Sequence, residues 1–167
     1  MLWKSGQGKK NAFLSLASVG ISFGMLILGS MLIRLQEIVF SAVFGEAALQ
    51  QARDNLNQFV IVQPSFMDVV IFGATSFLVI ALNEELFFRA FLLRVAGPSR
   101  VGGSLISASL FAAYHLVTSM SVYSIVFMVP YYFSWGLVLS AEYLASGEQL
   151  VFPILTHGSF NLLLLML

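Results

Sequence analysis

The stretch from Phe66 to Val95 reads FMDVVIFGATSFLVIALNEELFFRAFLLRV and contains no proline. It is apolar until Asn83, and it then places Glu84, Glu85 and Arg89 within hydrophobic sequence. At about 1.5 Å of rise per residue, a helix of this length can cross the hydrocarbon core of a bilayer, which is about 30 Å thick. Ionisable residues inside such a segment are costly and usually functional. The stretch therefore predicts a membrane-spanning helix that carries a polar site.

Two other apolar segments carry polar residues of the same kind. One contains Phe111-Ala-Ala-Tyr-His115, and the other contains His157-Gly-Ser-Phe-Asn161. With Glu84, they predict one buried site assembled from three helices. Each cluster alone also has a structural interpretation, as a buried ion-pair network or as hydrogen bonds between helices. Asp68, near the outer end of its helix, is expected to interact with the helix N-terminal dipole or to be an interfacial residue, rather than to act in catalysis.

The composition is that of an integral membrane protein. Hydrophobic residues make up 59% of the chain and charged residues only 10%, with sixteen phenylalanines. The formal net charge is zero, so nucleic acid is not an expected partner, whereas membrane lipid is. The chain has no cysteine, which excludes disulfides, thiol catalysis and thiolate metal sites.

The apolar runs predict an all-α fold, a polytopic membrane helix bundle of about five transmembrane helices. The first run lies behind a basic flank and is too long for a signal-peptide core, so we interpret it as a retained signal anchor, although a cleaved signal peptide is the alternative. The polar stretch from 45 to 58 fits a short interfacial amphipathic helix, or a solvated loop. We divide the chain into an N-terminal span with its polar loop, 1–65, and a core bundle, 66–167. The predicted spans are Ala12–Ile33, Phe66–Val95, 103–118, Val122–Leu144 and Leu150–Leu167.

Basic residues predict the orientation. Lys4, Lys9 and Lys10 place the N-terminus in the cytoplasm, and alternation of the spans returns Arg94 and Arg100 to that side. The polar loop and the C-terminus then lie outside, and the expected location is a plasma or inner membrane.

Helical rise supports one shared site. Counted along the spans, Glu84 and His115 both lie roughly 16 to 18 Å from the inner surface, and the turn from His157 to Asn161 reaches the same layer.

The residue types favour hydrolysis of an amide by activated water. Arg89 follows Glu85 by four residues, so these two can pair on one helical face and leave Glu84 as a general base. His115 is a second group that can position water, while His157 and Asn161 can donate to an oxyanion. The chain lacks a serine or cysteine nucleophile motif, which argues against an acyl-enzyme route. A zinc ion held by Glu84, His115 and His157 is the competing interpretation of the same atoms.

The three motifs together resemble the CPBP family (CAAX protease and bacteriocin-processing, or Abi), intramembrane proteases related to the type II CAAX prenyl endopeptidases. The family patterns EExxxR, FxxxH and HxxxN correspond to Glu84 to Arg89, Phe111 to His115 and His157 to Asn161, within a similarity that spans about 66 to 167. One departure is Ala90, where many relatives have glycine.

The resemblance implies an intramembrane endopeptidase. Glu84 and His115 would activate water, His157 and Asn161 would stabilise the oxyanion, and Glu85 and Arg89 would support the site. The expected substrate is a peptide or a membrane-tethered protein. The alternative is a non-proteolytic subunit or scaffold that uses the same fold to bind partners in a larger membrane complex.

Overall fold

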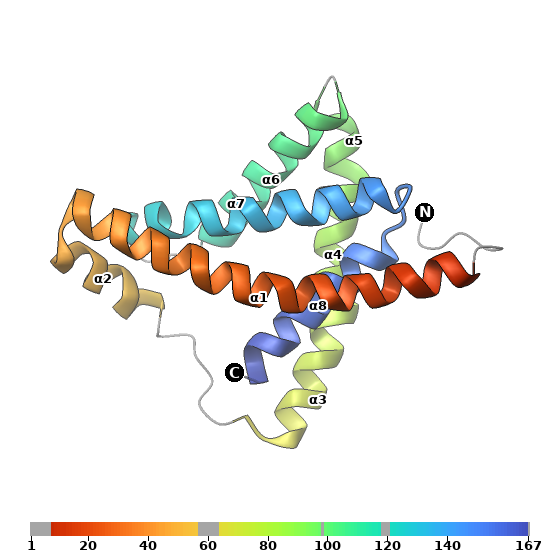
Figure 1. The fold of residues 1–167 in the computed structure, drawn as a ribbon, viewed down its shortest axis with the longest axis horizontal. Coiled ribbons are helices and arrows are strands. Elements are labelled where there is room, and N and C mark those ends of the chain that lie inside the picture. Colours follow the sequence, from red (N-terminus) through yellow and green to blue (C-terminus); the bar gives the residue numbers. More distant parts are fainter. Residues whose placement is uncertain (1–7, 57–63, 98, 118–120, 167) are drawn as a thin grey trace.

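The computed structural model describes residues 8–56, 64–97, 99–117 and 121–166, and within these ranges every regular element is a helix (Figure 1). The predicted all-α helix bundle is confirmed. The N-terminal elements are α1 (Gly8–Phe44) and α2 (Glu46–Leu56). The elements that carry the polar motifs are α3 (Phe66–Thr75), η2 (Ser76–Ala81), α4 (Leu82–Glu85), η3 (Leu86–Leu92), α5 (Leu93–Val95), α6 (Arg100–Leu116), α7 (Val122–Ala145) and α8 (Val151–Met166).

The first helix is longer than the sequence indicated. It continues through the mixed segment after Ile33 to Phe44, because no proline interrupts it. It ends where Gly45 adopts a left-handed conformation, with φ of 86°, and donates its backbone N–H to the carbonyl of Ser41. Glycine is the usual residue at this position after a helix, since it has no Cβ to clash there.

Helix α2 is the predicted short amphipathic helix, and its apolar face contacts protein. Ala48, Leu49 and Ala52 are buried in the same hydrophobic cluster as residues of α1 and α7. Arg53 on its polar face binds Glu37 of α1, with Nη2 2.8 Å from Oε1.

Elements α3 to α5 form one continuous helix from Phe66 to Val95, as predicted. Ser65 caps its start: its side chain accepts from the backbone N–H of Asp68, and Asp68 Oδ2 accepts from the backbone N–H of Ser65. This reciprocal capping box gives Asp68 the predicted structural role at the helix N-terminus. The helix ends before Gly97, and the adjoining Pro98 lies outside the described residues.

Salt bridges join two of the turns between helices on the predicted cytoplasmic side. Glu148, in the turn between α7 and α8, lies 2.9 Å from Arg94 Nη2 and 3.3 Å from Arg100 Nη2. These arginines flank the turn between α5 and α6. The turn at residues 146–149 and the basic residues around Gly97 therefore lie on the same side of the protein, as the topology prediction requires.

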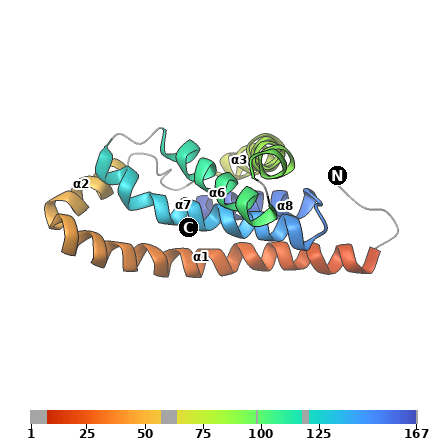
Figure 2. The same ribbon diagram turned by 90° about the horizontal axis from the view of Figure 1, so that it is seen from above.

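The helices cross steeply. In Figure 1 the rod formed by α3 to α5 runs across α1 and α7, and Figure 2 shows that rod almost end-on while α1 lies in the plane. The depths that were counted for the polar motifs assumed parallel helices, so they do not apply to this bundle. The polar motifs nevertheless lie close together. Three helices are long and apolar enough to cross a membrane: Gly8–Phe44, Phe66–Val95 and Val122–Ala145. Helices α6 and α8 are shorter, so the count of five spans stays a prediction.

Candidate active site

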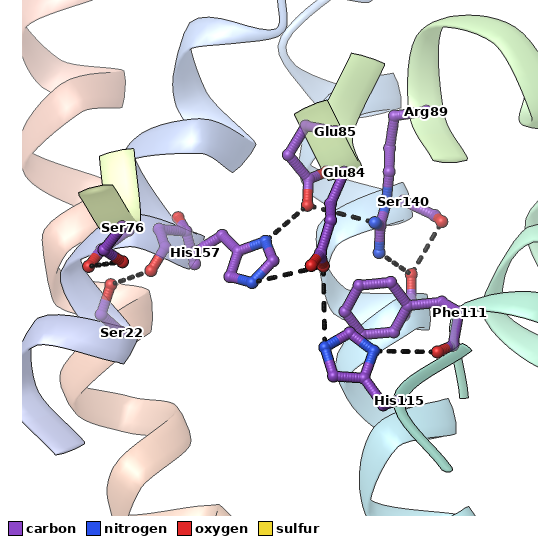
Figure 3. Close-up of polar contacts among 12 residues, drawn as sticks. Ser22, Ser76, Glu84, Glu85, Arg89, Phe111, His115, Ser140 and His157 are labelled. Carbon is purple, nitrogen blue, oxygen red and sulfur yellow. Dashed lines mark hydrogen bonds and ion pairs between the residues drawn. The ribbon is translucent and has the colours of Figure 1, made fainter. Parts of the chain in front are cut away.

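Glu84, His115 and His157 meet where α4, α6 and α8 come together (Figure 3). One Glu84 carboxylate oxygen, Oε2, lies 3.6 Å from Nε2 of His115 and 3.8 Å from Nε2 of His157. One ligand atom from each of the three residues lies within 4.8 Å of the others. These separations exceed a direct hydrogen bond and match a space that one small bridging species can occupy.

Both histidines are held through the ring nitrogen that faces away from Glu84. Nδ1 of His115 lies 2.9 Å from the backbone carbonyl oxygen of Phe111, and Nδ1 of His157 lies 2.9 Å from Oε1 of Glu85. Both partners are acceptors, so each Nδ1 carries the hydrogen and donates it. In the neutral imidazoles, both Nε2 atoms therefore direct a lone pair toward Glu84.

Glu85 and Arg89 form the predicted pair. Arg89 Nη1 lies 3.1 Å from Oε1 of Glu85, and both side chains are fully buried. Nη2 of Arg89 donates to the backbone carbonyl of Gly136 on α7, and the guanidinium lies 4.6 Å from the centre of the Phe111 ring. Glu85 thus links the arginine to His157, a contact that sequence spacing did not predict.

Glu84 and Glu85 lie between two π-helical turns, η2 and η3. A π-helical turn has a wider hydrogen-bonding pattern than an α-helix, and such turns occur frequently at functional sites. The continuous apolar sequence on either side contains no signal for them. Although the wide turns change the rotation of the helix on either side, Glu85 and Arg89 still form the i, i+4 pair that the spacing predicted.

Asn161 lies one helical turn beyond His157 on α8 and lines a cavity of about 150 Å³ with both histidines. Tyr132 of α7 forms another wall of this cavity, and its ring stacks on that of His115 at a centroid distance of 4.6 Å. The cavity gives a small group access to the two imidazoles and to the amide of Asn161.

The donor set fits a metal ion. Glu84 supplies a carboxylate oxygen, Oε2, that is buried and has no hydrogen-bond partner among the described residues, and each imidazole supplies a lone pair. Metal-binding histidines typically donate their other ring N–H to a carboxylate or a backbone carbonyl, which are the two partners present here. The group could therefore hold a metal ion, and one carboxylate with two imidazoles is a ligand set that zinc uses.

Glu142 is a further acid in an apolar helix that the sequence analysis missed. It lies on α7, and its Oε1 accepts hydrogen bonds from Ser18 of α1 at 2.6 Å and Thr156 of α8 at 2.8 Å. The signal was available, because Glu142 is an acid near the end of an otherwise apolar run. It lies beside the candidate site rather than within the cavity.

A family model described as Type II CAAX prenyl endopeptidase Rce1-like matches residues 66–163, which include all the polar motif residues. Neither a curated protein nor a solved structure matches the chain. The match leaves α1 and α2 outside its boundaries.

Proposed function

The chain belongs to the Type II CAAX prenyl endopeptidase Rce1-like family, and we propose that it hydrolyses a peptide bond in a peptide or membrane-tethered protein. The observation that carries this proposal is the convergence of one carboxylate and two imidazole Nε2 atoms on a single buried point. All three are hydrogen-bond acceptors when Glu84 is ionised and the histidines are neutral. A water molecule among them has acceptors for both of its hydrogens.

Glu84 acts as the general base in this proposal. A water hydrogen-bonded to Oε2 of Glu84 and Nε2 of His115 is held with its oxygen lone pair free to attack a carbonyl carbon. Glu84 takes the proton as the new bond forms and then returns it to the leaving amine. General base catalysis of this kind contributes roughly 10²- to 10⁴-fold in rate.

His157 and Asn161 stabilise the tetrahedral oxyanion. The amide NH₂ of Asn161 donates directly. His157 donates through Nε2 only when it is protonated on both ring nitrogens, since Nδ1 already donates to Glu85. Arg89 pairs with Glu85, so the carboxylate that holds Nδ1 of His157 has a cationic partner of its own.

A second form of the proposed mechanism would use a bound zinc ion. Glu84, His115 and His157 would hold it, and it would supply Lewis-acid polarisation of water or of the scissile carbonyl. Asn161 keeps its place as an oxyanion donor in this form. Glu85 and Arg89 keep the ring of His157 oriented.

A peptide-cleavage screen in detergent or lipid nanodiscs tests the proposal. Purified wild type and Glu84→Ala are incubated with a peptide library whose members are present with and without a C-terminal prenyl group, and the products are identified by mass spectrometry. We expect cleavage products from wild type that are absent with Glu84→Ala. Equal products from both proteins would contradict the assignment of Glu84, and the two peptide arms would show whether a prenyl group is required.

A non-proteolytic scaffold makes a different prediction. It requires a partner that copurifies in fixed stoichiometry, together with unchanged partner binding in Glu84→Ala. The endopeptidase proposal has the additional support of the ordered histidines, because an assembly surface has no need for two Nε2 lone pairs that face one carboxylate.

A further inference from the structure

Thr156, which precedes His157 on α8, forms hydrogen bonds with residues of α1 and α7. Thr156 Oγ1 lies 2.8 Å from Oε1 of Glu142 on α7 and 3.1 Å from the backbone carbonyl of Ser18 on α1. Ser22, one turn further along α1, donates to the backbone carbonyl of Thr156 at 2.9 Å. Helix α1 therefore contacts both the side chain and the backbone of Thr156.

The residue after His157 is held from the opposite direction. Ser76, in η2, donates to the backbone carbonyl of Gly158 at 3.3 Å. Gly158 also packs directly on the Phe77 ring, since a Cβ at this position would lie 2.3 Å from a ring carbon. Both neighbours of His157 are thus fixed by other helices, and the position of its imidazole depends on both contacts.

We propose that Glu142, through Thr156 and Ser18, is a positioning residue that sets the direction of the His157 imidazole. Helix α1 then helps to position a residue of the candidate active site. The proposal rests on the proposed role of His157 and extends it to a helix outside the matched family region. Glu142 does not contact the reacting atoms. It acts by fixing the turn of α8 from which His157 projects.

The hydrogen bonds give the side-chain oxygen at position 142 a role as a shared acceptor. Thr156 has one hydroxyl hydrogen and two acceptors within reach, Glu142 Oε1 and the Ser18 carbonyl. Ser18 also has two, Glu142 Oε1 and the Leu14 carbonyl of its own helix. A carboxylate oxygen that accepts from both hydroxyls draws them together, and so joins α1 to α8 at one point. An intramembrane acid is costly, which favours a functional reason for its presence.

Histidine spectroscopy can test the positioning role without any substrate. The chain has only two histidines, so ¹⁵N-histidine labelling gives two imidazoles, which are assigned with single His→Gln variants. In wild type we expect His157 to show one fixed tautomer, with the proton on Nδ1. Thr156→Val keeps the shape of the side chain and removes the hydroxyl, whereas Thr156→Ser keeps the hydroxyl.

In Thr156→Val we expect the two tautomers of His157 to exchange, so that the ¹⁵N chemical shifts of its two ring nitrogens become averaged, while those of His115 stay unchanged. We expect the Thr156→Ser spectrum to resemble that of wild type. Glu142→Ala should reproduce the Thr156→Val spectrum, and Glu142→Gln should restore the fixed tautomer because its amide oxygen still accepts. Ser30→Ala is the control on α1, since the Ser30 hydroxyl donates to the backbone carbonyl of Leu26 in the same helix.

An unchanged His157 spectrum in Thr156→Val would overturn the proposal. A change of both histidines to the same extent would also overturn it, because that pattern indicates general loosening of the bundle. These readouts do not depend on peptide cleavage, so a failure of the endopeptidase proposal would be seen separately. Where cleavage is measurable, Thr156→Val should lower kcat about 10- to 100-fold and leave KM unchanged.

Discussion

Nδ1 of His157 lies 2.9 Å from Oε1 of Glu85, and this contact connects the imidazole to a fully buried ion pair. The same oxygen lies 3.1 Å from Nη1 of Arg89. Oε1 of Glu85 therefore accepts hydrogen bonds from both Arg89 and His157. The contact explains why two adjacent glutamates have different tasks: Glu85 supports the site, and Glu84 faces the Nε2 atoms.

Removal of Arg89 should destabilise the protein strongly. In Arg89→Met, Glu85 is left buried without its cationic partner, which typically costs about 3–5 kcal/mol. The double variant Glu85→Gln/Arg89→Met removes both charges and should recover much of this loss. Thermal or denaturant unfolding in detergent gives the measurement.

The exposed pair of Arg53 and Glu37 provides a matched control. Both side chains are partly exposed, so Arg53→Met should cost no more than about 1 kcal/mol. An Arg89→Met variant as stable as Arg53→Met would mean that the buried pair does not contribute as described.

Zinc should stabilise the wild-type protein. A ligand that binds only the folded state stabilises it by about 2.7 kcal/mol at a concentration of 100 times Kd. We therefore expect added Zn²⁺ to raise the unfolding midpoint of wild type and to leave those of Glu84→Gln and His115→Phe unchanged. Metal analysis of the purified protein gives the stoichiometry. The absence of any shift in wild type would favour the water-bridged form of the site.

The topology can be tested by labelling, because the chain has no native cysteine. Helix α1 is about 55 Å long and the helix from Phe66 to Val95 about 45 Å, so both exceed a hydrocarbon core of about 30 Å. The two helices cross steeply (Figure 1), so we expect both to be tilted in the bilayer. In that arrangement we predict that the basic start of α1 and the arginines near Gly97 lie on one side.

Single cysteines at Lys10, Arg100 and Asn57 should then react with a membrane-impermeant reagent from different sides. We expect positions 10 and 100 to be labelled from the cytoplasmic side, and position 57 from the other. Labelling of positions 10 and 100 from opposite sides would show that the span assignment is wrong. Asn57 and Lys4 lie outside the described residues, so for them the prediction rests on sequence alone.

The helices and the convergence of the motifs could be predicted from the sequence. Membrane spans have strong hydrophobic signals, and polar residues within them usually face the bundle interior and pair with one another. The sequence also predicted the pair of Glu85 and Arg89 from i, i+4 spacing. It missed the contact of His157 with Glu85, which depends on how α8 crosses α4. It also missed the wide turns on either side of Glu84, for which hydrophobic periodicity has no signature.

Glu142 shows a different limit of sequence reasoning. Its position in an apolar run was informative, but its hydroxyl partners lie on two other helices. Serine and threonine are common in membrane helices, so nothing in their local sequence identified Ser18 and Thr156 as partners. Only the packing of α1 against α8 brings these groups together.

The cleavage rate of Glu84→Gln, measured against that of Glu46→Gln, tests the role of Glu84 most directly. Both changes convert an acid to its amide, but Glu46 is an exposed residue on α2, far along the chain from the site. We expect Glu84→Gln to lower kcat/KM by about 10²- to 10⁴-fold with an undiminished unfolding midpoint, and Glu46→Gln to cleave like wild type. Equal cleavage by Glu84→Gln and Glu46→Gln would contradict the claim that Glu84 activates the attacking water.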